Sequence, residues 1–205
     1  MFTGIIQAVL PITDLVRKKG LISIKLEPEA ENLKDLKHGA SIAINGVCLT
    51  AKEITNNSVS FDIIQETLDC STLQNLEIGS LVNFERSLQF GSEIGGHIIS
   101  GHIDTTAELV DIEQKENNYG LTFQCDSKWS KYILPKGFIG LHGASLTVVD
   151  PSPGNLTVWL IPETLEQTNL ASMVVGDRVN IEIDRQTQAI VDTVERVLVS
   201  QVKSH

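Results

Sequence analysis

Residues 44–50 read INGVCLT, and residues 141–147 read LHGASLT. The shared glycines are Gly46 and Gly143, so the second heptapeptide follows the first by 143 − 46 = 97 positions. In the first heptapeptide, Asn45-Gly46 is the typical sequence of a type I′ turn, and the residues on both sides of it alternate in the manner of β-strands. The sequence therefore predicts a tight hairpin here and a related one 97 positions later.

The same shift relates three further pairs of segments without a gap. These pairs are IQETL at 64–68 with IPETL at 161–165, GSLVNFE at 79–85 with GDRVNIE at 176–182, and TGII at 3–6 with SGHI at 100–103. Four matches in one register indicate a duplication, and a period near 100 residues is the length of a small domain rather than of a solenoid repeat. We therefore expect two homologous domains, residues 1–97 and 98–186, joined by a glycine-rich stretch.

Each repeat carries several short segments with strand-like alternation, for example residues 59–64 and 156–161. Short helices are expected at 66–73 and 163–170, and the many short strands favour a small closed barrel. The tail, residues 187–205, has no counterpart in the first repeat. Its apolar residues recur at steps of three and four, which predicts an amphipathic helix: Ile190, Val191, Val194, Val197, Leu198 and Val202.

Composition narrows the class of function. The chain has 205 residues and a formal net charge of −10. A protein this acidic has no general attraction for nucleic-acid phosphates or anionic lipids, and we expect neither partner. No apolar run is long enough to span a membrane.

Cys48, Cys70 and Cys125 form an odd set without CxxC spacing, which disfavours a disulfide framework and a cysteine zinc site. The start of the chain lacks the positive region of a signal peptide, so we expect reduced thiols in a cytoplasmic protein. Walker, HExxH and Rossmann motifs do not occur in the sequence.

Strand alternation brings small polar residues together beside each hairpin. After the first turn, Cys48 and Thr50 point to one face of their strand, and apolar residues point to the other. Ser145 and Thr147 hold the corresponding positions in the second repeat. Each residue alone is most often an ordinary strand residue. The pairing predicts two similar sites whose chemistry differs at the Cys/Ser position.

Two histidines and two threonines are further candidates. His97 and His102, five residues apart, would lie on opposite faces of a strand, which argues against a shared metal. A histidine here can carry a proton near neutral pH or serve a structural role. Thr67 and Thr164 stand where a strand leads into a helix. They either cap the helix or mark a turn whose backbone N–H groups bind a ligand.

Together, the segments MFTGII, SIAINGVCLT, FDIIQETL, VNFERSL, GGHIISGHID, KGFIGLHGASLTV and LIPETLEQTNL resemble the riboflavin synthase family, from Met1 to about Leu198. The resemblance implies an all-β fold with short helices: two homologous six-stranded Greek-key barrels that bind lumazine, followed by a helix at 187–205 that joins a homotrimer. It implies a dismutation of two molecules of 6,7-dimethyl-8-ribityllumazine to riboflavin and 5-amino-6-(D-ribitylamino)uracil. No cofactor or metal is implied, and lumazine synthase is a further expected partner.

The resemblance also assigns site residues by motif. Cys48, His102 and Ser145 would assist proton transfer and nucleophilic addition, supported by Ser41 and Asp184. The N-terminal barrel would bind substrate through Gly4, Ile5, Ile6, Cys48, Leu49, Thr50, Asp62, Ile63, Ile64, Gln65, Glu66 and Thr67. The C-terminal barrel would use Gly101, His102, Ile103, Lys136, Ser145, Leu146, Thr147, Trp159, Leu160, Ile161, Pro162, Glu163 and Thr164.

Two alternatives remain open. Lumazine- and flavin-binding antenna proteins share the duplicated fold without the activity, and a purely structural two-barrel protein is a third class. Cys48, His97, His102, Ser145 and Thr147 are all present, which favours the enzyme.

Overall fold

The computed structural model describes residues 1–115 and 118–202. The first repeat contains β1 (Ala8–Pro11), β2 (Asp14–Lys18), β3 (Leu21–Leu26), α1 (Ala30–Leu33), β4 (Ser41–Ile44), β5 (Val47–Ile54), β6 (Val59–Ile64), α2 (Gln65–Cys70), the 3-10 turn η1 (Thr72–Asn75) and β7 (Leu81–Arg86). The second contains β8 (Thr105–Lys115), β9 (Asn118–Gln124), η2 (Ser127–Tyr132), β10 (Phe138–Leu141), β11 (Ala144–Thr147), β12 (Asn155–Leu160), α3 (Pro162–Gln167), η3 (Asn169–Ser172) and β13 (Arg178–Ile183). The chain then forms α4 (Arg185–Val202).

Each repeat closes into a six-stranded barrel, as the sequence predicts. The second sheet runs β11-β10-β13-β8-β9-β12, and a bridge between Val148 and Val158 joins its two edges. The first sheet runs β1-β7-β4-β5-β6-β3-β2. A shift of 97 places β1 and β2 on the two ends of the long strand β8, so together they form one interrupted strand that closes the ring. In the first sheet, β4, β5 and β6 are consecutive neighbours, and β7 returns through a longer connection to lie beside β4. This is the strand order of a Greek key.

The interruption in this closing strand has a physical cause. A strand that pairs with two different neighbours along its length must bend sharply, and a bulge supplies the bend. In β8 the pairing with β9 shifts register between Leu109 and Asp111. In the first repeat the strand is broken at the equivalent positions, Ile12 and Thr13.

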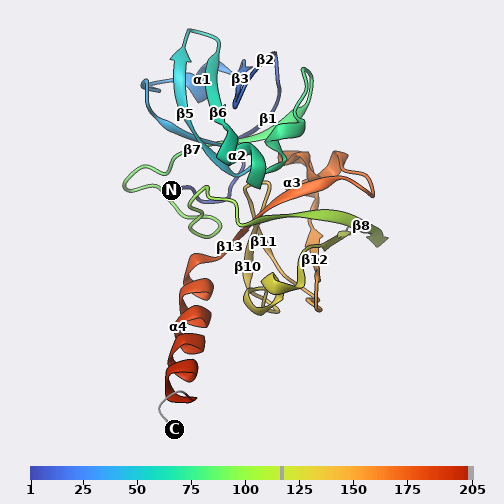
Figure 1. Cartoon of the computed structure of the whole chain (residues 1–205). Helices are drawn as coiled ribbons and strands as arrows, with labels where there is room; N and C mark the ends of the chain where they lie inside the picture. Colours follow the sequence, from blue (N-terminus) through green and yellow to red (C-terminus); the bar gives the residue numbers. More distant parts are fainter. Residues whose placement is uncertain (116–117, 203–205) are drawn as a thin grey trace.

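Alternating side chains give each barrel its own apolar core. On β6, Phe61 and Ile63 are fully buried, and on β12, Val158 and Leu160 take the same role. The two clusters are separate, one for each barrel. Figure 1 shows the barrels stacked, with the first above the second.

The two hairpins meet where the barrels touch. Asn45 and Gly46 have φ angles of 46° and 79°, and His142 and Gly143 have 47° and 83°, as a type I′ turn requires. A Cβ on Gly46 would lie 2.6 Å from the backbone N of Gly143, so only glycine fits this contact.

Paired hydrogen bonds surround the glycine contact. The Nδ2 of Asn83 donates to the carbonyl of His142, and the Nδ2 of Asn180 donates to the carbonyl of Asn45, both at 2.9 Å. Each bond maps onto the other under the 97-residue shift. The two sides of the contact between the barrels are therefore related by an approximate twofold axis, and Gly46 and Gly143 lie beside this axis.

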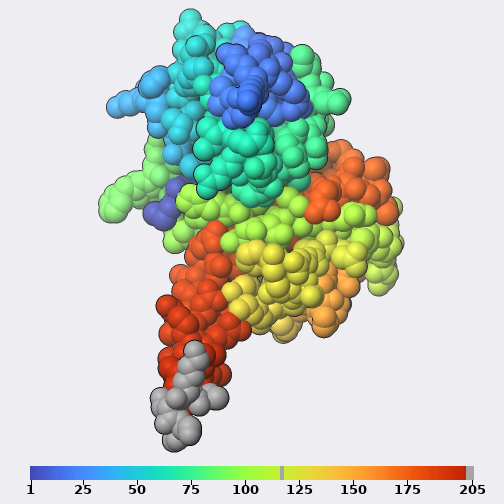
Figure 2. Space-filling model, in the orientation of Figure 1, coloured from blue at the N-terminus to red at the C-terminus, as the bar shows by residue number. Residues whose placement is uncertain are grey.

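Helix α4 (Arg185–Val202) confirms the predicted tail helix within the described residues; residues 203–205 lie outside them. It runs alongside η2 of the C-terminal barrel, where the Oη of Tyr132 donates to the carboxylate of Asp192, and it lies away from the N-terminal barrel (Figures 1 and 2). Several of its apolar residues are exposed, among them Ile190, Val194, Val197 and Leu198. Within the described parts of the chain, no helix combines the length and apolar character needed to cross a membrane.

The structure excludes one of the two alternatives for Thr67 and Thr164. They are not N-caps: the caps of α2 and α3 are Ile64 and Ile161, without a side-chain hydrogen bond, and the threonines lie inside the first turn. The segment that holds His97 and His102 is not a regular strand, because it makes only one isolated bridge, at Ile99, and Gly101 has φ of 84°.

Candidate functional site

The segments that lead into the two barrels cross over. We call residues 1–6 the first lead-in segment and residues 98–103 the second. Phe2 pairs with Ile99, its own counterpart under the shift, so the two segments run past each other beside the approximate twofold axis. The first then packs on the C-terminal barrel, where Ile6 joins the core, and the second packs on the N-terminal barrel.

This crossing corrects the expected grouping of site residues. The N of Ser145 donates to the carbonyl of Gly4 at 2.8 Å, and the N of Cys48 donates to the carbonyl of Gly101 at 2.9 Å. Residues 4–6 therefore accompany Ser145 in the C-terminal barrel, and residues 101–103 accompany Cys48 in the N-terminal barrel. The motifs of the sequence assigned each segment to its own repeat. In the structure, each lead-in segment forms hydrogen bonds with the hairpin strand of the other repeat.

Glycine is required where each lead-in segment passes the hairpin strand. Gly4 and Gly101 have φ angles of 75° and 84°. A Cβ on Gly4 would lie 2.5 Å from the Cβ of Ser145, and a Cβ on Gly101 would lie 2.5 Å from the Cβ of Cys48. No other residue permits this approach.

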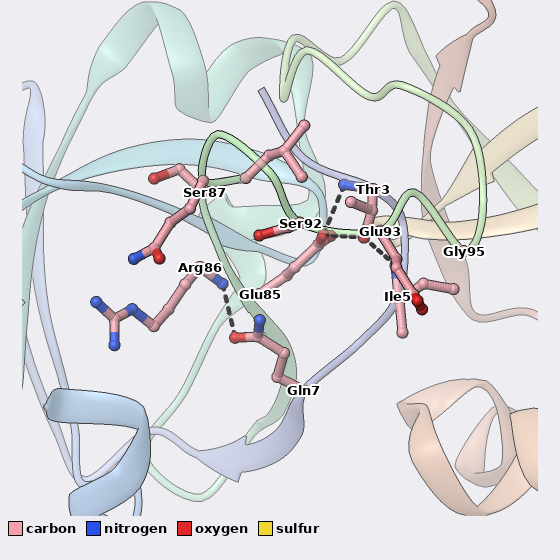
Figure 3. Close-up of a pocket in the computed structure, with 11 residues that line it drawn as sticks. Thr3, Ile5, Gln7, Glu85, Arg86, Ser87, Ser92, Glu93 and Gly95 are labelled. Atoms are coloured by element: carbon pink, nitrogen blue, oxygen red, sulfur yellow. Dashed lines mark hydrogen bonds between the residues drawn. The ribbon is translucent and has the colours of Figure 1, made fainter.

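A buried glutamate holds each lead-in segment in place. The carboxylate of Glu85 accepts from the N and Oγ1 of Thr3, at 2.7 and 2.8 Å (Figure 3). It also accepts from the N of Gly4. Glu182 does the same for Ser100 and Gly101. Burial raises the pKa of Glu85, although these hydrogen bonds oppose the shift. Neither glutamate was predicted as a site residue, although the repeated VNFE and VNIE segments contain them.

Ser145 lies in a pocket of about 220 Å³ on the C-terminal barrel. Its lining residues come from the first lead-in segment, β11 and α3: Gly4, Ile5, Ile6, Ala144, Ser145, Glu163, Thr164, Gln167 and Thr168. The structure thus brings together six predicted site residues from the two ends of the chain.

A histidine outside the predicted site set contacts Ser145. The Nδ1 of His97 lies 2.6 Å from the Oγ of Ser145, and its ring stacks on Phe138 with centroids 5.1 Å apart. Burial lowers the pKa of His97, while the nearby charge of Asp184 opposes the shift. The 97-residue shift pairs His97 with no histidine in the sequence. The sequence marked His97 as a candidate proton carrier, but nothing in the pattern connected it with Ser145.

Asp184 connects this cluster to the tail helix. Its carboxylate accepts from the N and Oγ1 of Thr187, at 2.9 and 2.7 Å, and so caps α4. Burial alone would raise its pKa, but the bonds from Thr187 and Gln186 and the proximity of His97 bring it below the ordinary value. The predicted residue is therefore placed to fix α4 and to favour a proton on His97.

The N-terminal barrel presents a more open arrangement. Cys48 is half-buried and packs with Phe2 and Ile99, His102 is exposed, and Ser41 pairs with Thr50 across β4 and β5. This side therefore carries a thiol where the other carries a hydroxyl, and its histidine is accessible.

Most predicted site residues lie outside the lining of the Ser145 pocket, among them Trp159, Lys136 and Asp62. Trp159 is on the outer face of β12, Lys136 occupies a turn with φ of 64°, and Asp62 is on the outer face of β6. None of them is in the lining of the described pocket. Within residues 1–115 and 118–202, no group of three or more His, Cys, Asp or Glu residues could hold a metal ion.

Comparison with known proteins agrees with this geometry. The lumazine binding domain matches residues 3–87 and 100–184. Riboflavin synthase of Escherichia coli (strain K12) is 50% identical over 202 residues, covering 98% of this chain and 95% of that protein. Riboflavin synthase of Chlamydia pneumoniae is 41% identical over 203 residues, covering 99% and 100%.

The fold is similar to that of solved structures. The crystal structure of LumP complexed with riboflavin has a TM-score of 0.82 at 26% identity, and covers 90% of this chain and 100% of that one. Two matched domains and full-length relatives lead to one conclusion: the chain belongs to the riboflavin synthase family of proteins with duplicated lumazine-binding domains.

Proposed function

We propose that this protein is a riboflavin synthase, which moves a four-carbon unit between two molecules of 6,7-dimethyl-8-ribityllumazine to form riboflavin and 5-amino-6-(D-ribitylamino)uracil. The observation that carries the proposal is the integrity of both repeats. Cys48 beside Gly101 and Ser145 beside Gly4 form two equivalent settings in one chain. Two identical substrates require two such settings. Relatives with this name align over nearly the whole chain.

The chemistry needs only acid–base and nucleophilic groups. The donor loses two ring carbons with their methyl groups and the acceptor gains them, so no external oxidant or reductant is consumed. A proton must leave the C7 methyl group of one molecule, and a nucleophile must add at C7 of the other. Side chains that exchange protons near neutral pH can serve both steps.

Ser145 and His97 are suited to the addition step in the C-terminal barrel. A neutral imidazole 2.6 Å from a hydroxyl can accept its proton, either for direct attack or to orient water. Asp184 would stabilise the imidazolium that results. Cys48 is the counterpart in the N-terminal barrel, where exposed His102 would carry protons and Ser41 would support the site.

The strand-to-helix turns at 62–67 and 159–164 would bind the pyrimidine ring through backbone groups, and Lys136 would complement the polar substrate. Each unit, residues 1–97 and 98–186, would hold one lumazine, together with the lead-in segment that crosses over. Stacking the two rings in the reacting orientation would supply much of the acceleration.

The tail, residues 187–205, would join three chains. The exposed apolar residues of α4 support this, because such a stripe on a projecting helix needs a partner. In a homotrimer the reacting pair would lie between the N-terminal barrel of one subunit and the C-terminal barrel of another. We also infer a cytoplasmic location, where the three unpaired thiols would stay reduced, and lumazine synthase as the neighbouring enzyme.

The function is tested by incubating the purified protein with the lumazine and following the formation of riboflavin by its absorbance spectrum. Separate Cys48→Ala and His102→Ala variants test the roles of those side chains, and unchanged turnover in both would overturn that assignment. Binding of lumazine without product would instead favour the antenna class, which the likeness to LumP keeps as the second candidate.

A further inference from the structure

An arginine at the start of the tail helix reaches the second lead-in segment. Arg185 is the first residue of α4, and its Nη2 donates to the carbonyl of His102 at 2.7 Å. Its Nη1 lies 2.9 Å from the Oδ1 of Asp104, and it also donates to Gln188 in the next turn of the helix. A guanidinium holds its donors in a rigid fork, so it can fix two acceptors in one geometry. Arg185 therefore ties the end of the second lead-in segment to α4.

The chain is held just before and just after His102. After it, the side chain of Asp104 is only 9% exposed, and its Oδ2 accepts from the N of Ile183 at 2.8 Å. Before it, the carboxylate of Glu182 accepts from the N of Gly101 at 2.9 Å. The side chain of His102 is nevertheless exposed. A ring with a fixed backbone and free access is suited to exchanging protons with a bound substrate.

The first repeat lacks the arginine. The 97-residue shift relates three pairs: Ile5 with His102, Gln7 with Asp104, and Leu88 with Arg185. Gln7 keeps the bond to the backbone, because its Oε1 accepts from the N of Arg86 at 3.0 Å. The side chain of Leu88 has no donor, and the side chain of Ile5 does not exchange protons. The arginine is thus present in the repeat whose lead-in segment carries a histidine.

We propose that Arg185 is a positioning residue, which fixes the backbone of His102 against α4 so that the imidazole is aimed at the substrate on the N-terminal barrel. The inference rests on the proposed function, in which His102 carries protons. A proton carrier acts only within hydrogen-bonding reach of the group that it serves, so a small displacement of its backbone lowers the rate of turnover. Because α4 is also the proposed contact of the trimer, Arg185 would link this site to the assembly of the chains.

Loss of the arginine should affect turnover only while His102 is present. Arg185→Met removes the donors and keeps a long side chain of similar helix propensity. We expect kcat for riboflavin formation to fall by about tenfold, and the KM for the lumazine to change by less than about twofold. In a His102→Ala background, Arg185→Met should lower kcat no further, since residues that act through one group are not additive. Additive losses would show a purely structural role and overturn the proposal.

A second variant separates positioning from the cost of an unpaired charge. Arg185→Met leaves the carboxylate of Asp104 without its cation, and Asp104→Asn/Arg185→Met removes both charges. The double variant should lose as much kcat as Arg185→Met, and a return to the wild-type rate would contradict the positioning role. The control is Arg178→Met, because Arg178 also donates to a backbone carbonyl, that of Thr106. This control should keep the wild-type kcat, and an equal loss in it would also overturn the proposal.

Two measurements on the whole chain without substrate complete the test. Amide hydrogen exchange of peptides that cover residues 100–104 should be faster in Arg185→Met than in wild type and Arg178→Met, because a local contact is lost. Light scattering should give the same mass for all three proteins. Unchanged exchange, or a lower mass in Arg185→Met, would overturn the positioning role. If wild type forms no riboflavin, the proposed function fails, while the exchange rates still test the contact of Arg185 with this segment.

Discussion

The Oγ of Ser145 lies 2.6 Å from the Nδ1 of His97, and the histidine belongs to the segment that joins the two repeats. The repeat pattern does not predict this pair, because within residues 1–115 and 118–202 no side chain makes a hydrogen bond to the Sγ of Cys48. The duplicated sites therefore differ in two ways: one has a thiol where the other has a hydroxyl, and the hydroxyl site has a buried imidazole beside it.

Replacing His97 by Gln should lower kcat for riboflavin formation by about a hundredfold, the usual range for loss of a positioned base. Because burial lowers the pKa of His97, the wild type should lose activity only as the pH falls below 6.5. The variant should lack that limb in a kcat–pH profile. His38→Gln, at an exposed histidine, is the control. A variant with the wild-type rate and limb would contradict the role of His97.

Replacing Gly46 by Ala should reduce the free energy of unfolding by more than about 2 kcal/mol. The new Cβ would combine a strained positive φ with a clash 2.6 Å from the backbone N of Gly143. Gly20 has a similar φ of 73°, but a Cβ there would have no atom within 4 Å. Gly20→Ala should therefore reduce the free energy of unfolding by only about 1 kcal/mol. Urea denaturation compares the two. Equal losses would show that contact between the hairpins adds nothing to stability.

His142 should make the fold sensitive to acid. Burial lowers its pKa from 6.5 to about 3. Between these values the unfolded chain binds a proton that the folded chain does not, so stability falls as the pH falls, by up to about 1.4 kcal/mol per pH unit. His142→Asn introduces the residue that the first repeat has at the equivalent position, Asn45. This variant should reduce the dependence of stability on pH. Unfolding curves at several pH values check it; an unchanged slope would point to other groups.

Adding charge to the exposed apolar face of α4 should dissociate the trimer that we propose. Val194→Asp combined with Leu198→Asp would place carboxylates in an apolar contact, where an unpaired charge is strongly unfavourable. Light scattering should then give the mass of one chain, 22.4 kDa, instead of three. Gln201→Asp adds a charge at an exposed polar position of the same helix and should keep the trimer. Persistence of the wild-type mass in the double variant would exclude α4 as the contact.

Local patterns predicted much of the architecture. Asn45-Gly46 fixed a type I′ hairpin because both residues tolerate positive φ, and strand alternation gave the outward positions of Cys48 and Ser145. The three- and four-residue spacing of the tail predicted α4. Thr67 and Thr164 show the limit of such reasoning, since a threonine can cap a helix or stand within its first turn with the same sequence around it, and only the structure excluded capping.

By itself, the sequence determined the duplication, through the constant shift of 97 residues, and the hairpins, through their turn residues. Strand alternation also favoured a barrel, although the closure of the barrel needs pairs far apart in the chain, such as Ala8 with Phe84. Only the tertiary structure decided that each lead-in segment serves the other barrel and that His97 reaches Ser145. The segments around Gly4 and Gly101 have no regular pairing of their own, and their polar groups are satisfied by strands far away in sequence. The partners of these hydrogen bonds depend on how the two folded barrels pack against each other, and a local sequence pattern does not contain that information.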